Sequence, residues 1–209
     1  MTLNLNKFDI TSIPDKSVLM IIGNRCSGKN TLCIDIIKQH ENIQNISVVT
    51  HTNKIKYEND VPNCLTYEQY NDDTDPVPEI IQRHKIHNEP EIFILDNLHQ
   101  NPSCYEDKLM SDIFLNRIQC NFLTIVNMQN VTRIPVDMRC SVDYYFIFAE
   151  NFKSNRKIIY KNYAGVFPTF RYFCDALDEY TENYGCLVIK NTGSCPTIFD
   201  KIFWYRVED

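Results

Sequence analysis

Residues 23–31 carry the residue types that a phosphate-binding loop needs. Gly23 and Gly28 let the backbone curl until its N–H groups surround an anion. Lys29 adds a positive charge that reaches the β- and γ-phosphates of a nucleotide. The apolar run at 17–22 predicts a buried strand before the loop, and the apolar spacing after Lys29 predicts a helix whose N-terminal end attracts anions. We therefore predict that nucleotide phosphates are held by Gly23, Asn24, Arg25, Cys26, Ser27, Gly28, Lys29, Asn30 and Thr31.

One residue of this loop departs from the usual pattern, in which Ser or Thr follows the lysine and gives Mg²⁺ a hydroxyl ligand. Asn30 stands at that position. An amide oxygen can also bind a hard cation, but the longer Asn side chain reaches differently. Thr31 comes one residue later, about 100° further round the helix, and is poorly placed to replace the hydroxyl. The sequence thus predicts Mg²⁺ binding through Asn30 that is weaker than usual.

A second segment, Ile92–Asn97, consists of an apolar run, an acid and an amide. In enzymes with a phosphate-binding loop, an acid at the end of such a strand holds Mg²⁺, and we assign this role to Asp96. Asn97 occupies the position where many of these enzymes have Glu or Asp to orient the attacking water. An amide cannot act as a general base, but it can position water by hydrogen bonds, as a glutamine does in small GTPases.

Further polar residues each allow two interpretations. Gln129, at the end of the predicted strand 121–129, fits either a sensor of the γ-phosphate or a solvated strand end. Arg133 and Arg139 each fit either an arginine that enters a neighbouring subunit's active site or a surface arginine. The segment 151–161 fits either a solvated helix face or a surface facing DNA or another subunit. Its basic residues are Lys153, Arg156, Lys157 and Lys161.

Composition narrows the class of protein. The chain has 209 residues, 44% of them hydrophobic, which suits one α/β domain over 1–209 with an extended lead-in at 1–16. We find no apolar run long enough to span a bilayer and no signal-peptide pattern. Nine cysteines are scattered singly, so we expect reduced thiols and no zinc site. Because the net charge is −6, any contact with DNA must be local, shared across an oligomer, or dependent on nucleotide.

Strand-like and helix-like segments alternate along most of the chain. We predict strands at 17–22, 46–50, 91–97, 121–129, 142–149, 184–190 and 199–205. We predict helices at 29–40, 79–87, 105–119, 155–164 and 169–181, and a loop at 71–78. This order is typical of an α/β fold with a mostly parallel central sheet flanked by helices on both faces. Such sheets bind ligands at the carboxyl ends of their strands, where both motifs lie.

Several motifs in the second half of the chain have a specific residue order. They are MQNVTRIPVDMRCSVDYYFIF at 128–148, Tyr-Ala-Gly-Val-Phe-Pro-Thr-Phe at 163–170, Thr-Glu-Asn-Tyr at 181–184 and Cys-Leu-Val-Ile at 186–189. Through these motifs and the loop, the chain resembles the DNA-packaging ATPases of large nucleocytoplasmic DNA viruses. These form the poxvirus-type branch of the FtsK–HerA superfamily of P-loop NTPases. The resemblance runs from Gly23 to the end of the chain.

The resemblance implies a RecA-like fold and an ATP-driven homo-oligomeric ring that moves double-stranded viral DNA into a capsid. It implies ATP and Mg²⁺, with Lys29 on the phosphates, Asp96 on Mg²⁺, Gln129 as a sensor and Arg139 acting in trans. It also implies work in the host cytoplasm, at the virus factory, and in the virion, beside capsid or internal-membrane assembly proteins. In a ring, several subunits offer a few basic side chains each to one duplex, which is compatible with the net charge.

Three functions stay open on the sequence alone. The chain could be an active packaging motor, a degenerate relative with a structural role in the packaging or assembly machine, or a P-loop enzyme of another class, such as a nucleotide kinase. Asn30 and Asn97 favour the second, because the family has Ser or Thr and an acid at these positions. The absence of an arginine-rich lid in the sequence argues against a kinase. ATP turnover stimulated by double-stranded DNA would separate the first from the second.

Restoring the usual residues tests whether hydrolysis is merely attenuated. We expect Asn30→Ser combined with Asn97→Asp to raise steady-state ATP turnover, on the order of 10²-fold, because it returns a hydroxyl ligand and a carboxylate beside the attacking water. Adding Lys29→Ala to the double variant is the control and should abolish the gain. Unchanged turnover would mean that the site has lost more than these two groups.

Overall fold

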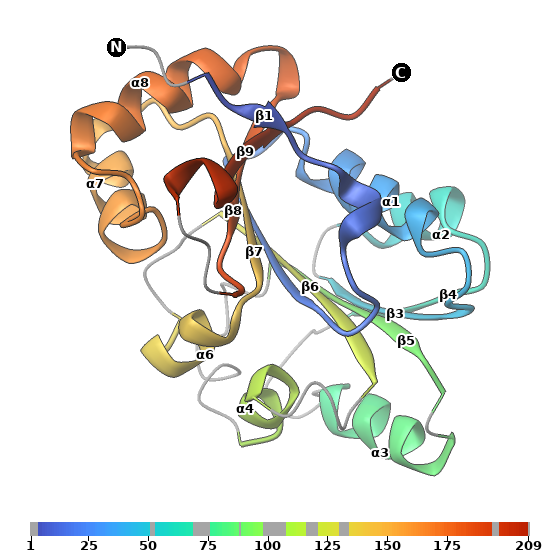
Figure 1. Ribbon diagram of the computed structural model, residues 1–209. Coiled ribbons are helices and arrows are strands. Elements are labelled where there is room, and N and C mark those ends of the chain that lie inside the picture. The colour runs from blue at the N-terminus through green and yellow to red at the C-terminus, as the bar shows by residue number, and fades with distance from the viewer. Residues whose placement is uncertain are drawn as a thin grey trace.

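The described strands form one nine-stranded sheet, in the spatial order β1-β9-β8-β7-β2-β6-β5-β3-β4 (Figure 1). The computed structural model describes residues 4–50, 53–68, 76–87, 89–97, 108–115, 121–129, 134–193 and 197–208. The strands are β1 (Asn6–Lys7), β2 (Val18–Ile22), β3 (Asn45–Thr50), β4 (Cys64–Glu68), β5 (Glu91–Asp96), β6 (Phe122–Met128), β7 (Tyr144–Phe148), β8 (Cys186–Lys190) and β9 (Ile202–Tyr205).

Six neighbouring strands, from β7 to β4, run parallel to one another. Strands β8 and β9 extend the sheet in antiparallel fashion, and β1 pairs with β9 in parallel. Every residue of Val18–Ile22 is buried, as expected for a strand of a parallel sheet that is covered on both faces. The predicted α/β fold with a mostly parallel sheet is therefore confirmed.

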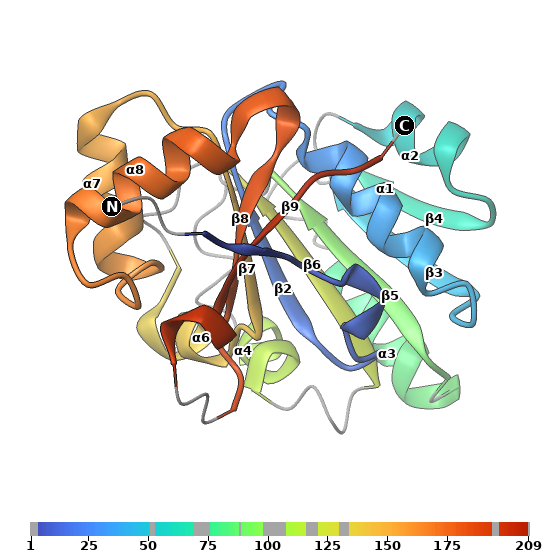
Figure 2. The same cartoon turned by 45° about the horizontal axis from the view of Figure 1, so that its top comes forward.

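Helices cover both faces of this sheet (Figures 1 and 2). They are α1 (Lys29–Gln39), α2 (Lys54–Asp60), α3 (Val77–His87), α4 (Lys108–Leu115), α6 (Val136–Ser141), α7 (Lys153–Asn162) and α8 (Phe170–Tyr180). Apolar residues of α1 and α2 join one buried cluster, whereas those of α3, α4, α6, α7 and α8 join the other. In the described residues we find no helix with the length and apolar character needed to cross a membrane.

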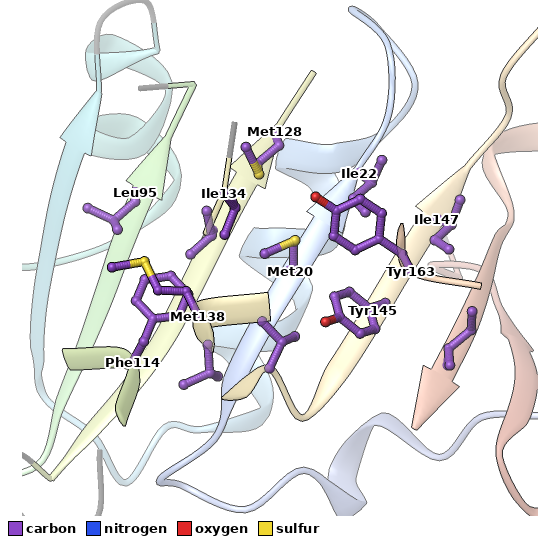
Figure 3. Packing of buried hydrophobic residues seen from close by; sticks show 14 of the residues in the cluster. Met20, Ile22, Leu95, Phe114, Met128, Ile134, Met138, Tyr145, Ile147 and Tyr163 are labelled. Atoms are coloured by element: carbon purple, nitrogen blue, oxygen red, sulfur yellow. The ribbon is translucent and has the colours of Figure 1, made fainter. Parts of the chain in front are cut away.

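Alternation along the strands divides the core between these two layers. In β2, Met20 and Ile22 face the cluster under α4 and α6, while Leu19 and Ile21 face the cluster under α1. Figure 3 shows the first cluster, where Met20 of β2 lies between side chains of β6 and the side chain of Tyr145 on β7. Burial of each large apolar side chain of this kind stabilises the fold by about 1.5–3 kcal/mol.

Several short elements were missed in the sequence. Helix α2 is polar and buries only Tyr57, so it lacks an apolar stripe. Strand β4 lies at the edge of the sheet, and helix α6 is only 6 residues long. Patterns this short fall below the window in which periodicity is informative. Residues 71–75 of the predicted loop, and the parts of the predicted helix 105–119 on either side of α4, lie outside the described residues.

The predicted extended lead-in at 1–16 is a structured part of the sheet from residue 4 onward. It contains β1 and a 3₁₀ helix, η1 (Ile10–Ser12), whose first turn is capped by Asp9 through a 3.1 Å hydrogen bond from the N–H of Thr11. Phe8 is buried and its ring centre lies 5.5 Å from that of Tyr144. The lead-in is thus anchored by apolar contacts that its polar composition does not suggest.

Gly185, between α8 and β8, is required by a close backbone approach. A Cβ on this residue would lie 2.4 Å from the carbonyl oxygen of Tyr180, so the backbone would have to move. We expect Gly185→Ala to lower the free energy of unfolding by about 1–3 kcal/mol, measured by urea unfolding. The matched control is Gly165→Ala, where an added Cβ meets nothing within 4 Å. Equal stability of the two variants would contradict this account.

Candidate nucleotide-binding site

The predicted site residues follow the carboxyl ends of parallel strands at one edge of the sheet (Figure 2). The loop at 23–28 follows β2, Asp96 ends β5 with Asn97 directly after it, and Gln129 follows β6. Strand pairing keeps these ends level, since Asp96 lies opposite Asn127 of β6. The fold therefore brings together residues that are distant in the sequence.

The two loop glycines are held against a floor that β7 provides. A Cβ on Gly23 would lie 2.5 Å from Ser27 Oγ and 2.8 Å from Phe148 Cβ. Gly28 has a φ of 104°, a left-handed conformation that favours glycine, and a Cβ there would lie 3.2 Å from the Phe148 ring. Phe148 thus fixes the path of the loop from below, a contact that the sequence did not reveal.

The backbone N–H groups of the loop are available to a ligand. Cys26 and Gly28 both have positive φ, 61° and 104°, which turns the backbone repeatedly. Among the described residues, no group accepts a hydrogen bond from the N–H groups of residues 28–31, at the start of α1. These donors, together with the positive end of the helix, form a site for an anion.

Lys29 is buried and turned toward the backbone of its own loop. Its Nζ donates to the carbonyl oxygens of Gly23 at 2.8 Å and Asn24 at 2.7 Å. Burial lowers the pKa of this ammonium, and the nearby charges of Asp96 and Cys26 partly oppose that shift. A phosphate is a stronger partner for the ammonium than two neutral carbonyls, so the lysine is poised to exchange one for the other.

Asp96 is fully buried, and side chains from the end of β3 and the start of α2 bind one of its oxygens. Asn53 Nδ2 donates to Asp96 Oδ2 at 2.7 Å, and Thr50 Oγ1 does so at 3.2 Å. The other oxygen, Oδ1, has no hydrogen-bond partner among the described residues. A buried carboxylate in this condition is costly unless a cation or a donor meets it.

Two amides beside Asp96 also carry unpaired buried oxygens. Asn97 has a φ of 58°, and its N–H donates to the carbonyl of Asn127 at 3.0 Å. Asn127 in turn donates to the hydroxyl of Tyr57 at 3.2 Å. The side-chain Oδ1 atoms of both asparagines have no partner in the described chain. Unpaired acceptor oxygens suit a cation or a water molecule and not an anion.

The donor types fit Mg²⁺, which prefers oxygen ligands and is usually held by one or two carboxylates together with substrate phosphates. Asp96 offers the unpaired Oδ1, and Asn30 is half-buried in the first turn of α1, whereas the side chain of Thr31 is exposed. In the described ranges, no three His, Cys, Asp or Glu side chains form a group that could hold a metal ion alone. Nucleotide phosphates are common further ligands of a Mg²⁺ ion held in this way.

The remaining predicted residues lie farther from this cluster or lie outside the described part of the chain. Gln129 is exposed just beyond β6, and its role as a sensor stays a prediction. Arg139 lies on α6, which precedes β7 and so occupies the edge of the sheet opposite the loop (Figure 2). Arg139 therefore does not reach the loop of its own chain. Arg133 lies outside the described residues.

The surroundings of Arg139 are strongly basic. Its Nη1 donates to Asn162 Oδ1 at 2.6 Å, and its guanidinium lies 5.7 Å from the centre of the Tyr163 ring. A cavity of about 270 Å³ lies beside it, and none of the described residues that line it is Asp or Glu. The other cations that line it are Lys161, Lys190 and Lys201. Within the described part of the chain, these four cations form a local positive surface, although the net charge of the whole chain is −6.

In the predicted basic segment 151–161, the arginine forms an ion pair within the fold, whereas the lysines are exposed. Arg156 donates to both carboxylate oxygens of Asp178, at 3.0 and 2.5 Å, and this bond raises its pKa. It therefore joins α7 to α8. The side chains of Lys153, Lys157 and Lys161 are exposed.

Sequence reasoning missed the residues that support the site. Thr50 ends a predicted strand, and a polar strand end was an available signal. Asn53 and Phe148 gave no such signal, because their contacts depend on which strands become neighbours.

No family model matches the chain. Uncharacterized protein 075L of Invertebrate iridescent virus 6 is 29% identical over 199 residues, which cover 91% of this chain and 74% of the relative. An uncharacterized protein of Acanthamoeba polyphaga mimivirus is 26% identical and covers 99% of this chain, with 80% of its own length matched. These relatives come from large DNA viruses.

The solved structures give a stronger likeness in fold than in sequence. The genome packaging NTPase B204 from Sulfolobus turreted icosahedral virus 2, in complex with AMP, matches with a TM-score of 0.67 and 15% identity. The match covers 93% of this chain and 98% of B204. B204 in complex with ATP-gammaS matches with a TM-score of 0.65. The fold of this chain is therefore that of the P-loop NTPases.

Asn53 is expected to position Asp96 for Mg²⁺. Because the Asn53 side chain caps no N–H of α2, Asn53→Ala removes the contact to Asp96 without uncapping the helix. We expect the Mg²⁺ concentration for half-maximal ATP turnover to rise about tenfold, as for other partners of metal ligands. Nucleotide affinity measured without Mg²⁺ should stay unchanged. The control is Asn45→Ala, which alters an exposed residue at the opposite end of β3. A shift in Mg²⁺-free affinity alone would contradict the assignment.

Proposed function

We propose that the chain is the ATPase of a viral genome-packaging motor of the poxvirus-type FtsK–HerA branch. The observation that supports this most is that hydrogen-bond donors and unpaired acceptor oxygens lie at the same edge of the sheet. Donors and the buried Lys29 line the loop, whereas Asp96 and two amides offer unpaired oxygens. That division suits a phosphate chain together with its cation. The fold of B204 and the large-virus relatives support the packaging role.

The residues divide the work of hydrolysis. On binding, the N–H groups of the loop and Lys29 hold the phosphates of ATP. Asp96 and Asn30 would hold Mg²⁺, which neutralises charge on the β- and γ-phosphates when bound. Asn97 orients the attacking water through its amide, and Gln129 senses the γ-phosphate. Because Asn97 is not a base, turnover should be slow compared with that of relatives that have an acid there.

Arg139 serves the nucleotide of a neighbouring subunit in this proposal. It lies opposite its own loop, so only a second chain can place a nucleotide beside it. A homo-oligomeric ring provides such a neighbour. The exposed lysines of α7 and the basic cavity supply local positive charge for double-stranded DNA despite the acidic whole. The protein would act in the host cytoplasm, at the virus factory, and in the virion, beside capsid or internal-membrane assembly proteins.

A second function is favoured by the two asparagines. With Asn30 and Asn97 in place of a hydroxyl and an acid, the chain could bind nucleotide without turning it over and serve as a structural subunit of the assembly machinery. This alternative uses the same loop and the same fold. It differs from the motor in lacking ATP turnover and the DNA movement that turnover would drive.

Steady-state ATP hydrolysis with Mg²⁺, with and without double-stranded DNA, distinguishes the two. For a motor, DNA raises turnover, the increase shrinks with added salt, and Lys29→Ala lowers turnover on the order of 10²- to 10³-fold. Lys38→Ala, an exposed lysine in the last turn of α1, is the matched control and should leave turnover unchanged. ATP binding without turnover would instead favour the structural subunit.

The same assay tests the trans role of Arg139. Lys29→Ala and Arg139→Ala chains should each be inactive alone, but mixing them should restore part of the turnover. Some interfaces of a mixed ring then pair an intact loop with an intact arginine. Arg171→Ala, whose side chain is 92% exposed, is the control and should be active by itself. Failure of the mixture to recover activity would contradict a trans role.

A further inference from the structure

The turn Thr181–Gly185, which joins α8 to β8, lies against the phosphate-binding loop. The Cβ of Tyr184 lies 3.5 Å from the position that a Cβ on Gly28 would occupy. The sheet order places this turn and Asp96 on opposite sides of β2, because β8 lies beyond β7 whereas β5 lies beyond β6. The loop therefore has a cation-binding side at Asp96 and a second side at Tyr184.

The side chain at this second border is a large, accessible aromatic ring. Tyr184 is 71% exposed, while Gly185 and Cys186 directly after it are buried. A single exposed aromatic residue is common on protein surfaces and has no meaning by itself. Here the Cβ of Tyr184 lies beside Gly28, directly before the N-terminus of α1, where no described group accepts from the loop N–H groups, and this location distinguishes Tyr184 from other exposed aromatic residues.

The backbone at Tyr184 has an unfavourable conformation that neighbouring contacts hold in place. Asn183 and Tyr184 both have left-handed backbones, with φ of 50° and 62°. Two consecutive non-glycine residues in this region are disfavoured and persist only where their surroundings fix them. The fixing contacts come from Glu182, whose carbonyl accepts from the N–H of Gly185 at 3.0 Å and from Arg206 Nη2 at 3.1 Å.

The same region is tied to the helix that follows the loop. The hydroxyl of Tyr205, on β9, donates to Asp35 Oδ2 of α1 at 2.7 Å. Strand β9 pairs with β8, so this contact joins the C-terminal strands to α1. The contacts of Glu182 and the bond between Tyr205 and Asp35 therefore together set the position of Tyr184 relative to the loop.

We propose that Tyr184 is the platform on which the base of a bound nucleotide stacks. This inference rests on the proposed function, because it takes the phosphates to lie in the loop. With the cation side of the phosphates toward Asp96, the nucleoside leaves the loop on the Tyr184 side. Stacking is tolerant of base identity because every base has a π-face. The ligand class is thus a nucleoside triphosphate, with little discrimination between adenine and guanine at this platform.

Calorimetric titration of the full chain with three ligands tests the platform. The ligands are AMPPCP, its guanosine counterpart, and inorganic tripolyphosphate, which has the phosphates but no base. Tyr184→Ala should weaken both nucleotides about tenfold and leave tripolyphosphate unchanged, whereas Tyr184→Phe should bind all three like the wild type. The matched control is Phe199→Ala, a half-exposed aromatic residue at the opposite sheet edge, which should change nothing.

Other outcomes overturn the platform in distinguishable ways. Nucleotide affinity that is unchanged in Tyr184→Ala would overturn it and leave the proposed function intact. Weaker binding of tripolyphosphate and nucleotides by the same factor would also overturn it, because Tyr184 would then merely support the loop. If the wild-type chain bound neither tripolyphosphate nor nucleotide, the proposed function would fail and the platform with it.

Discussion

The parallel pairing of β2 with β6 on one side and β7 on the other is the constraint on which the rest of the site depends. Pairing with β6 brings the loop to the edge where β5 and its Asp96 also end. Pairing with β7 places Phe148 beneath the loop, so close that both glycines are required. The two neighbours of β2 thus set the path of the loop and its distance from Asp96.

Burial then gives the site its chemical character. Lys29 and Asp96 both lie in the interior, where charge is unfavourable unless it is matched. Each is only partly matched within the described chain, by carbonyl oxygens for the lysine and by Thr50 and Asn53 for the acid. A phosphate and a cation would complete both sets of contacts at once. The stability of this region should therefore increase with ligand, since binding to the folded state alone stabilises it.

The C-terminal third of the chain contributes more than extra strands. The antiparallel strands β8 and β9 carry the strained turn at Tyr184 and the contact between Tyr205 and Asp35 of α1. Helices α7 and α8, joined by Arg156 and Asp178, pack with α6 on the face that includes Arg139. The same region thus borders the loop at one edge of the sheet and forms the basic cavity at the other. In the ring that we propose, the two edges would face different subunits.

The sequence by itself determined the loop, the acid and the alternation of strands with helices. Gly23, Gly28, Lys29 and the run before Asp96 are local patterns, and local patterns can be read without neighbours. Only the tertiary structure decided that Thr50 and Asn53 bind Asp96, that Phe148 underlies the loop and that Arg139 lies at the far edge. These facts depend on strand order and register, which join residues far apart in the chain, and side-chain periodicity specifies which face is buried but not which strand lies beside it.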